Sequence, residues 1–503
     1  MTLVLLHDLI GKGAADAGRI AIVDGERTFT YLDLAETVER MAGALVEAGV
    51  KRGDRVAILL PKSFEECAAI FAASRADAVF VPINPVLKAQ QIAHILADSG
   101  ARSVVTTAAQ AAAMRAAGTL PQDVSIIVAD QPLPAAKLKP AVGIGQDLAA
   151  ILYTSGSTGT PKGVMLSHAN LLAGTRIVRT YLGIHREDSI LSILPFSFDY
   201  GLNQLLTSVE QGARLVLGSF ELGDQIVSQL ARHRITGLAG VPTIWALLTK
   251  TAPSLKRTPL PHLRYITNSG GAVPEATVKR LRALLPETRI FLMYGLTEAF
   301  RSTFLPPDEV DRRPTSMGKA IPECEVFPVT ADGNRAKPGE PGILVHRGPT
   351  VSLGYWKRPE DTARVLRPNP LRAPECGGET VCWSGDLVVE DEDGFLYFVG
   401  RQDAMIKSAG YRISPTEVED VLMGTGAFRQ VAVIGLPDEW VGQKVCAVAV
   451  PMNGEVDTAS VLKVTGLTLP GHMVPSRIDL VEHLPTTPNG KVDYKTLVAE
   501  RSR

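Results

Sequence analysis

The sequence predicts an α/β protein with a large N-terminal domain of stacked α/β subdomains, a β-rich subdomain and a small α+β C-terminal domain. Short β-rich runs alternate with helical patterns over roughly the first 300 residues, and the helical patterns become rare after about residue 320. Strands that alternate with helices indicate mainly parallel sheets. A chain of 503 residues is also too long for one core, so we expect two to four domains or subdomains.

The strands expected in the N-terminal part are short apolar runs rich in β-branched residues. They are RVAILL (55–60), AVFVPI (78–83), ARSVVTT (101–107), VSIIVAD (124–130), AAILYTS (149–155), ARLVLG (213–218), LRYITNS (263–269) and RIFLMYG (289–295). Apolar residues at helical spacing predict helices at 34–48 and 223–233. The alanine-rich stretch 107–117 predicts a surface helix, and the apolar first residues predict a helix packed on the core.

The part of the chain after about residue 320 reads as antiparallel hairpins, because GILVHR and LVVEDEDGFLYFVG are apolar runs joined by DEDG and ADG turns. From Asp403 a new unit begins, with a helix in TEVEDVLMGTG, strands in QVAVIGLP and KVCAVAVP, and a helix near 458–464. A tail of roughly one hundred residues has the size of an independent domain. We therefore expect domains at 1–402 and 403–503.

Composition excludes several classes of function. The formal net charge is −1, so nothing indicates a nucleic-acid binder or a protein of the membrane surface. The five cysteines are scattered and form no CxxC pair, which argues against a disulfide framework or a zinc site and fits a reducing cytoplasm. The apolar N-terminus is interrupted by Asp8 and lacks a basic region, so we expect neither a signal peptide nor a membrane span.

The strongest motif is ILYTSGSTGTPKGV (151–164), an apolar strand that runs into a loop of glycine, serine and threonine with one lysine. Small residues let backbone N–H groups and hydroxyls close around phosphate oxygens, and Lys162 adds positive charge. The loop lacks the GxxxxGK[ST] order of a Walker motif. The alternative is a flexible surface turn.

Four further segments accompany this loop in order. They are TYLDL (30–34), MYGLTE (293–298), the pair WSGD (383–386) and FVGRQD (398–403), and PNGK (488–491). Together with the loop they resemble the core motifs of the adenylate-forming superfamily, which comprises acyl-CoA synthetases, peptide-synthetase adenylation domains and firefly-type luciferases. The resemblance covers nearly the whole chain and implies ATP-dependent activation of a carboxylic acid, followed by transfer of the acyl group to a thiol.

The resemblance also implies a nucleotide site. Its expected members are Thr154, Ser155, Gly156, Ser157, Thr158, Gly159, Lys162, Gly270, Gly271, Ala272, Tyr294, Gly295, Thr297, Glu298, Asp386, Arg401 and Lys491. Glu298 is expected to bind Mg²⁺ with help from Thr154 or Thr297, because magnesium prefers carboxylate and phosphate oxygens. Asp386 resembles the carboxylate that accepts from the ribose hydroxyls, and Gly270 to Ala272 with Tyr294 resemble the adenine slot. Lys491 resembles the lysine that bridges carboxylate and phosphate.

Asp403 matches the hinge of this superfamily, about which the small domain rotates between the two half-reactions, so the C-terminal domain is expected to be mobile. By the same resemblance, Lys407, Gly410 and Tyr411 lie in the loop that approaches the thiol tunnel.

The segment LPFSFDYGLNQ (194–204) departs from many fatty or aryl CoA synthetases, which carry histidine where Phe198 stands. It resembles the SFD pattern of amino-acid adenylation domains, in which the aspartate binds the substrate ammonium. A carboxylate at Asp199 would suit an amine, whereas a bare alkyl chain would leave it buried without a partner. The alternative is that Asp199 is the N-cap of a helix.

The same correspondence gives a polar acyl pocket, whose expected members are Asp199, Tyr200, Asn203, Asn268, Met293, Arg301 and Ser302. Arg301 could bind a second carboxylate or a carbonyl of the substrate. It could equally pair with Asp199 or Glu298.

The acceptor of the acyl group stays open between two alternatives. LPGHMVP (469–475) resembles the LPxYMVP of peptide synthetases, which favours the phosphopantetheine of a separate carrier protein. The whole chain most resembles stand-alone bacterial acyl-CoA ligases of exosortase-associated clusters, which favours free CoA. A nucleotide-binding module without catalytic activity is a third alternative, which Lys491, Glu298 and Asp386 argue against.

Overall fold

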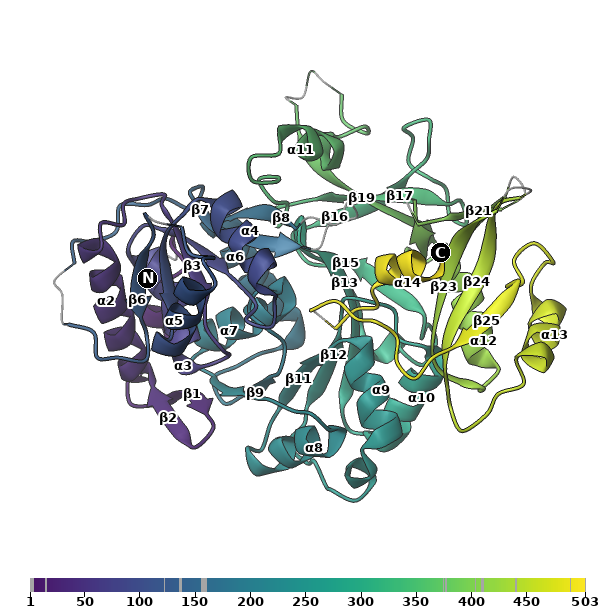
Figure 1. Cartoon of the computed structure of the whole chain (residues 1–503), viewed down its shortest axis with the longest axis horizontal. Coiled ribbons are helices and arrows are strands. Elements are labelled where there is room, and N and C mark those ends of the chain that lie inside the picture. The colour runs from purple at the N-terminus through teal and green to yellow at the C-terminus, as the bar shows by residue number, and fades with distance from the viewer. Residues whose placement is uncertain are drawn as a thin grey trace.

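The computed structural model describes residues 4–13, 16–121, 123–134, 138–154, 161–373, 375, 378–402, 404–408, 411–438, 441–488 and 490–502. In Figure 1 the purple and blue N-terminal elements lie on the left, the teal and green elements fill the centre, and the yellow C-terminal elements lie on the right. Three sheets organise these elements, with six, fourteen and five strands.

The first sheet is mainly parallel and has the order β6-β5-β3-β4-β7-β8, in which only β7 and β8 pair antiparallel. Its strands are β3 (Arg55–Leu59), β4 (Val79–Pro82), β5 (Ala101–Thr106), β6 (Ser125–Val128), β7 (Leu148–Thr154) and β8 (Lys162–Ser167). The helices that accompany it are α3 (Phe64–Arg75), α4 (Ala89–Ser99) and α5 (Ala108–Ala116). Because α3 contacts β3 and β4 of this sheet and β1 of the next, it joins both sheets to one core.

The second sheet begins with the order β2-β1-β10-β9-β11-β12-β13, in which all pairs except β1 with β2 are parallel. These strands are β1 (Ile20–Asp24), β2 (Arg27–Thr30), β9 (Ser189–Ser192), β10 (Arg214–Leu217), β11 (Gly237–Gly240), β12 (Tyr265–Asn268) and β13 (Arg289–Leu296). The surrounding helices are α1 (Asp8–Gly13), α2 (Tyr31–Glu47), α6 (His168–Leu182), α7 (Asp199–Gln211), α8 (Gly223–Arg232), α9 (Pro242–Thr251), η2 (Pro253–Lys256) and α10 (Glu275–Leu284).

After β13 the sheet continues antiparallel into the β-rich subdomain. Its elements are β14 (Ala299–Leu305), η3 (Pro307–Glu309), β15 (Ser316–Ala320), β16 (Glu325–Val329), β17 (Gly342–Arg347), α11 (Pro359–Val365), β18 (Leu366–Pro368), β19 (Thr380–Glu390) and β20 (Leu396–Arg401). The predicted hairpin in LVVEDEDGFLYFVG is confirmed, because β19 and β20 pair antiparallel.

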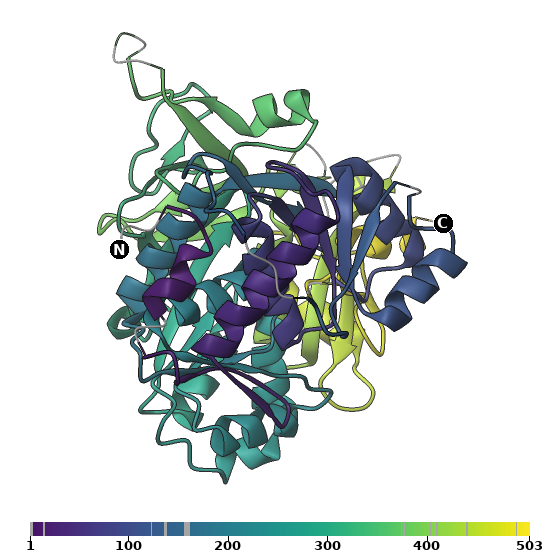
Figure 2. The ribbon, with the colours of Figure 1, turned by 90° about the vertical axis from the view of Figure 1, so that its left-hand side faces the viewer.

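The third sheet forms a smaller C-terminal domain with its own apolar clusters. Its elements are β21 (Ile406–Ser408), β22 (Tyr411–Ile413), α12 (Pro415–Gly424), β23 (Phe428–Asp438), β24 (Gly442–Pro451), α13 (Thr458–Thr468), β25 (Arg477–Leu480) and α14 (Tyr494–Arg501). Figure 2 shows this yellow domain behind the N-terminal elements. The boundary at Asp403 stays a prediction, because that residue lies outside the described part of the chain.

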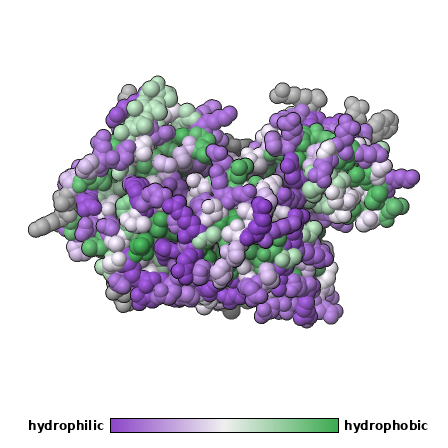
Figure 3. Space-filling model, turned by 90° about the horizontal axis from the view of Figure 1, so that it is seen from below, coloured by the Kyte–Doolittle hydropathy of each residue, from purple (hydrophilic) through white to green (hydrophobic). Residues whose placement is uncertain are grey.

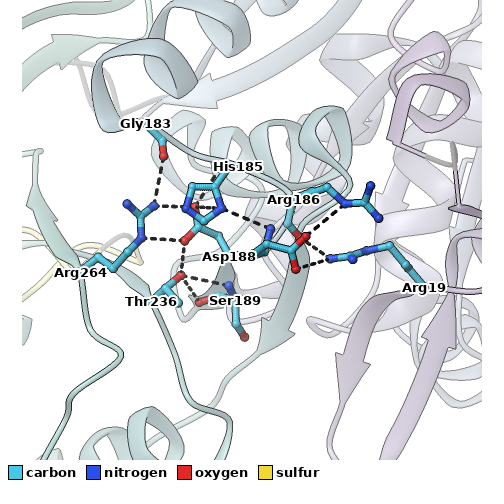
Figure 4. A network of polar contacts seen from close by, with 9 residues as sticks. Arg19, Gly183, His185, Arg186, Asp188, Ser189, Thr236 and Arg264 are labelled. Atoms are coloured by element: carbon cyan, nitrogen blue, oxygen red, sulfur yellow. Dashed lines mark hydrogen bonds and ion pairs between the residues drawn. The ribbon is translucent and has the colours of Figure 1, made fainter.

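A partly buried ion pair joins the amino ends of three parallel strands (Figure 4). Asp188, Thr236 and Arg264 immediately precede β9, β11 and β12. Arg264 donates from Nε and Nη2 to the two carboxylate oxygens of Asp188 at 3.0 and 2.7 Å, and Thr236 Oγ1 donates to Oδ1 at 2.7 Å. Such bidentate pairs fix geometry strongly. The register of the three strands is therefore set at the end opposite their carboxyl ends, where ligands bind in open α/β sheets.

The helix that begins in TYLDL shows how sequence sets an element end. Thr30 is the N-cap of α2, its hydroxyl accepts from Asp33 N, and the Asp33 carboxylate accepts from Thr30 N at 2.7 Å, which completes a capping box. In the part of the chain that the structure describes, no helix combines the length and the apolar character needed to cross a membrane. The face in Figure 3 is mainly hydrophilic, with smaller hydrophobic patches between the polar residues.

Candidate active site

Lys491 reaches the N-terminal domain from a turn in front of α14. Thr487 N donates to Lys491 O at 2.7 Å, and Lys491 N donates to Thr487 Oγ1 at 3.3 Å, so the turn fixes the lysine backbone. The turn contacts the N-terminal domain through Asn84 Nδ2, which donates to Pro488 O at 3.5 Å, and Thr243 Oγ1, which donates to Gly490 O at 3.5 Å. Figure 1 shows this yellow loop extending from the C-terminal domain toward the centre of the molecule.

The Lys491 side chain lies between the predicted acyl pocket and the predicted adenine slot. Its ammonium is 5.4 Å from the centroid of the Phe198 ring. Gly270 has a φ of +84°, and a Cβ there would come within 3.2 Å of Lys491 Cε, so glycine gives the lysine its space. Desolvation lowers the pKa of Lys491, whereas the charges of Asp199 and Glu298 act in the opposite direction.

Asp386, the predicted ribose ligand, is 5% exposed and sits on β19. It accepts from the Tyr294 hydroxyl, and its Oδ1 lies 3.4 Å from Arg401 Nη1 on β20. Burial and this carboxylate raise the pKa of Tyr294 well above its usual value. Tyr294 stacks on His346, and burial lowers the pKa of His346 to about 3. The structure thus brings Tyr294, Asp386 and Arg401 together, as the motifs predict.

Glu298 lies in the turn between β13 and β14, beside Thr297. Its Oε1 accepts from the Tyr355 hydroxyl at 2.6 Å, and its backbone carbonyl accepts from Ser352 N at 2.9 Å. Lys162, at the start of β8, forms an ion pair of 2.9 Å with Asp361 on α11. The hydrogen bond that Asp361 accepts from Lys162 lowers the pKa of the Asp361 carboxyl group.

The segment 194–198 folds back over the start of α7 because Gly201 carries no side chain there. A Cβ on Gly201 would meet the carbonyl oxygen of Pro195 at 2.1 Å. Phe198 is the N-cap of α7 and makes no side-chain cap bond, and Asp199 is the first helical residue. The alternative that Asp199 is the N-cap is therefore wrong. Its carboxylate in the first turn still interacts favourably with the helix dipole.

Asp199 forms a buried ion pair with Arg301 on β14. Arg301 Nη1 lies 3.3 Å from Asp199 Oδ2, and the two side chains are only 2% and 4% exposed. Of the partners considered for Arg301, Asp199 is the one that the structure shows. The face of the guanidinium lies over the Tyr200 ring, 4.6 Å from its centroid, and Tyr200 is fixed by donating to Thr267 O at 2.7 Å.

Comparison with protein-family models tests the resemblance drawn from the motifs. A model described as "AMP-binding enzyme" matches residues 12–356, and one described as "AMP-binding enzyme C-terminal domain" matches residues 417–491. The chain belongs to the AMP-binding enzyme family.

Known relatives extend this result. A feruloyl-CoA synthase of an Amycolatopsis species is 34% identical over 482 residues, which are 94% of this chain and 94% of that protein. A linear gramicidin synthase of Brevibacillus parabrevis is 31% identical over 488 residues, which are 95% of this chain and 9% of that protein. The crystal structure of ATP-bound MatB from Rhodopseudomonas palustris has a TM-score of 0.88 and 27% identity, with 99% of each chain covered. The protein is an AMP-forming acid–thiol ligase.

Three other residues of the predicted acyl pocket in this AMP-binding enzyme, Asn268, Met293 and Ser302, contact neighbouring protein groups. Asn268 Oδ1 accepts from Trp245 Nε1 and its Nδ2 donates to Gly271 O, both at 2.9 Å, so this amide is used by the protein. Met293 Sδ contacts the Tyr181 hydroxyl at 3.0 Å, and Ser302 Oγ donates to Ala299 O at 3.2 Å. Several polar groups of the predicted pocket therefore bond to other protein groups rather than facing a substrate.

Several predicted residues of the AMP-binding enzyme lie outside the described part of the chain. They are Ser155, Gly156, Ser157, Thr158, Gly159, Asp403 and Gly410. Thr154 ends β7 and Lys162 begins β8, so the two ends of the phosphate loop pair with each other. Sequence reasoning missed Tyr355 and Asp361, although both lie in the polar segment GYWKRPED (354–361), which was a signal for a second partner of the site.

Proposed function

We propose that this AMP-binding enzyme adenylates a small carboxylic acid with an amine near its carboxyl group and passes the acyl group to a phosphopantetheine thiol. The observation that carries this proposal is the position of Lys491 between Phe198 and Gly270. Attack of a carboxylate on the α-phosphate brings two anions together, and a positive charge at that point offsets their repulsion.

The predicted nucleotide residues fit ATP with magnesium. Among the described residues, no group of three or more His, Cys, Asp or Glu side chains forms a metal site by itself. Mg²⁺ keeps several waters and takes one or two carboxylates together with phosphate oxygens. Glu298 would be the protein carboxylate, with the hydroxyl of Thr154 or Thr297 assisting. The ion, when bound, would neutralise phosphate charge, and Asp386 would accept from the ribose hydroxyls beside Tyr294.

The buried carboxylate of Asp199 is the reason for proposing that the substrate acid carries an amine. This carboxylate accepts from Arg301 through Oδ2, and its negative charge opposes the desolvation that lowers the pKa of Lys491. A substrate ammonium would share this carboxylate with Arg301, because a carboxylate can accept up to about four hydrogen bonds.

Amino acids are therefore expected to support ATP–pyrophosphate exchange better than their des-amino analogues. An ammonium that pairs with Asp199 gains a charge-assisted hydrogen bond worth about 1.5–3 kcal/mol, or roughly a 10- to 150-fold preference. The measurement is exchange with matched pairs such as alanine and propionate. Equal or better exchange with the des-amino acids would remove the amine from the proposal and keep the ligase.

The phosphopantetheine thiol could belong to either of two acceptors. Free CoA is supported by the feruloyl-CoA synthase, which matches this chain over 94% of its own length. A separate carrier protein is supported by the linear gramicidin synthase and by the segment LPGHMVP (469–475).

The enzyme is incubated with ATP, CoA and an acid that it adenylates, and acyl-CoA is the product expected if free CoA is the acceptor. Mass spectrometry would detect the thioester on CoA or on a phosphopantetheine-bearing carrier protein offered in parallel. The control is the same carrier without its phosphopantetheine. Acylation of the carrier alone would select the second acceptor.

A further inference from the structure

A small buried cavity lies beside the Asp199–Arg301 pair, between α6, α7 and strands β11 to β13. Its volume is about 20 Å³, which has room for one water-sized group. Its polar lining comes mainly from α7, which contributes Asn203 and Gln204, and from β14, which contributes Arg301. Apolar residues such as Leu182, Ile190 and Met293 form the rest of its wall.

The polar side chains of this cavity lack partners. Arg301, Asn203 and Gln204 are 2%, 4% and 6% exposed. Among the described residues, nothing accepts from Arg301 Nε and Nη2 or from Asn203 Nδ2, and Gln204 Nε2 and Oε1 are also without hydrogen bonds. Buried donors normally find partners, because an unmade hydrogen bond in the interior destabilises the fold. These donors therefore indicate a group that is not part of the protein.

The two free nitrogens of Arg301 are neighbours on one edge of the guanidinium plane. The same edge of Arg264 is filled by both oxygens of Asp188, at 3.0 and 2.7 Å. In Arg301 the remaining nitrogen, Nη1, pairs with Asp199, and the face lies over Tyr200. The guanidinium is thus held in place with its bidentate edge left open. Such an edge matches a carboxylate or a carbonyl oxygen.

The backbone at Arg301 supports a functional role. Its φ is +80°, which is uncommon for a residue other than glycine. Such conformations persist where the surroundings impose them, and they cluster at ligand sites. Gly295 provides the space, since a Cβ there would lie 3.1 Å from Arg301 Cα.

We propose that Arg301 determines which acid is activated, by donating hydrogen bonds from Nε and Nη2 to an oxygen at the end of the acid far from the reacting carboxyl group. This inference rests on the proposed function, because it places the acid in this pocket. Lys491 marks the carboxyl end, near Phe198, and Arg301 with Asn203 and Gln204 marks the far end. The substrate class is a short acid that ends in a carboxylate or carboxamide, and acids with plain alkyl ends are rejected.

The test uses 5′-O-sulfamoyladenosine carrying acyl groups, which imitates the acyl-adenylate and needs no turnover. Three alkyl compounds that carry the amine of the proposed function, 2-aminobutanoyl, 2-aminopentanoyl and 2-aminohexanoyl, are compared with the corresponding ω-carboxylates and ω-carboxamides by titration calorimetry. The best oxygen-bearing compound is expected to bind about 10- to 100-fold more tightly than the alkyl compound of equal length, as for hydrogen bonds to a charged group. Whichever of the carboxylate and carboxamide series binds best identifies the source of the oxygen.

Two variants assign the preference to its residues. Arg301→Lys keeps a positive charge opposite Asp199 and removes the planar edge, so the preference is expected to fall to about threefold or less. Gln204→Met leaves the ion pair intact and removes only an amide, so it tests the same cavity in a fold that keeps Arg301. The matched control is Gln90→Met on the exposed side of α4, for which the preference is expected to stay unchanged.

Each other result has a definite meaning. Alkyl compounds that bind as well as their oxygen-bearing partners, yet better than unacylated sulfamoyladenosine, overturn the inference and leave the proposed function standing. Acyl compounds that bind no better than unacylated sulfamoyladenosine overturn the proposed function and the inference with it. A preference that survives in Arg301→Lys overturns the assignment to Arg301. Variants that lose stability without any change in preference show that the cavity holds only water.

Discussion

Lys491→Ala is expected to reduce adenylation by about 10²- to 10³-fold, the usual effect of removing one group that stabilises developing charge. The reason is that the proposed role of Lys491 is to supply positive charge where the substrate carboxylate meets the α-phosphate, and its side chain lies near Phe198 and Gly270. Thioester formation from a supplied acyl-adenylate should persist, because no phosphate anion is being attacked in that step. ATP–pyrophosphate exchange measures the first step, and thioester release from acyl-adenylate measures the second.

The control for this substitution is Lys463→Ala, which removes a solvent-exposed lysine from α13 of the same domain. Its exchange rate should equal that of the unchanged enzyme. An equal loss of both half-reactions in Lys491→Ala would mean that the substitution damages the fold, and the assigned role of the lysine would be lost.

Breaking the Asp199–Arg301 pair is expected to destabilise the N-terminal domain by about 3–5 kcal/mol for either single substitution, Asp199→Leu or Arg301→Met. Each change leaves the other charge buried and unpaired, and side-chain exposures of 4% and 2% leave little solvent to screen it. The double substitution should recover most of this loss, because replacing a buried ion pair by apolar residues of similar volume is often close to neutral. Urea denaturation of the four proteins gives the coupling free energy.

Additive losses in this cycle would contradict a buried pair, since additivity is expected for independent sites. A control pair is Lys279 and Glu275 on α10, which form an exposed i,i+4 ion pair. Their single substitutions should change the free energy of unfolding by no more than about 0.5 kcal/mol.

The elements that sequence predicted are those with their own local signal. The helix predicted at 34–48 is α2, whose start Thr30 and Asp33 fix by capping. Strands β9 and β11 were missed, because SILS and GLAG each place only two apolar residues between serines or glycines. Their place is set by parallel neighbours and by the Asp188–Arg264 pair, which joins residues distant in sequence. Such tertiary partners leave no trace in a local pattern.

The candidate site likewise contains residues that a local motif indicates and contacts that only the folded chain creates. Motif residues such as Glu298, Asp386 and Lys491 could be proposed as site residues from sequence alone, because each stands in a short recognisable segment. The partner of Arg301 could only be given as a choice, since a strand and a distant helix must meet before the pair exists. Nothing in the sequence indicates that His346 belongs to the site. Its stacking partner Tyr294 is distant in sequence, so the contact appears only in the folded chain.

The turn that carries Lys491 meets the large domain through contacts that are easy to break. Its hydrogen bonds from Asn84 and Thr243 are both 3.5 Å long, at the outer limit for such bonds, so each contributes little. The charges of Asp199, Glu298 and Asp386 favour the charged form of Lys491 and so help to hold it there. If ATP binds beside these residues as proposed, its phosphates would add negative charge and hold the turn more firmly, and the departure of pyrophosphate would weaken that hold and make it easier for the small domain to move.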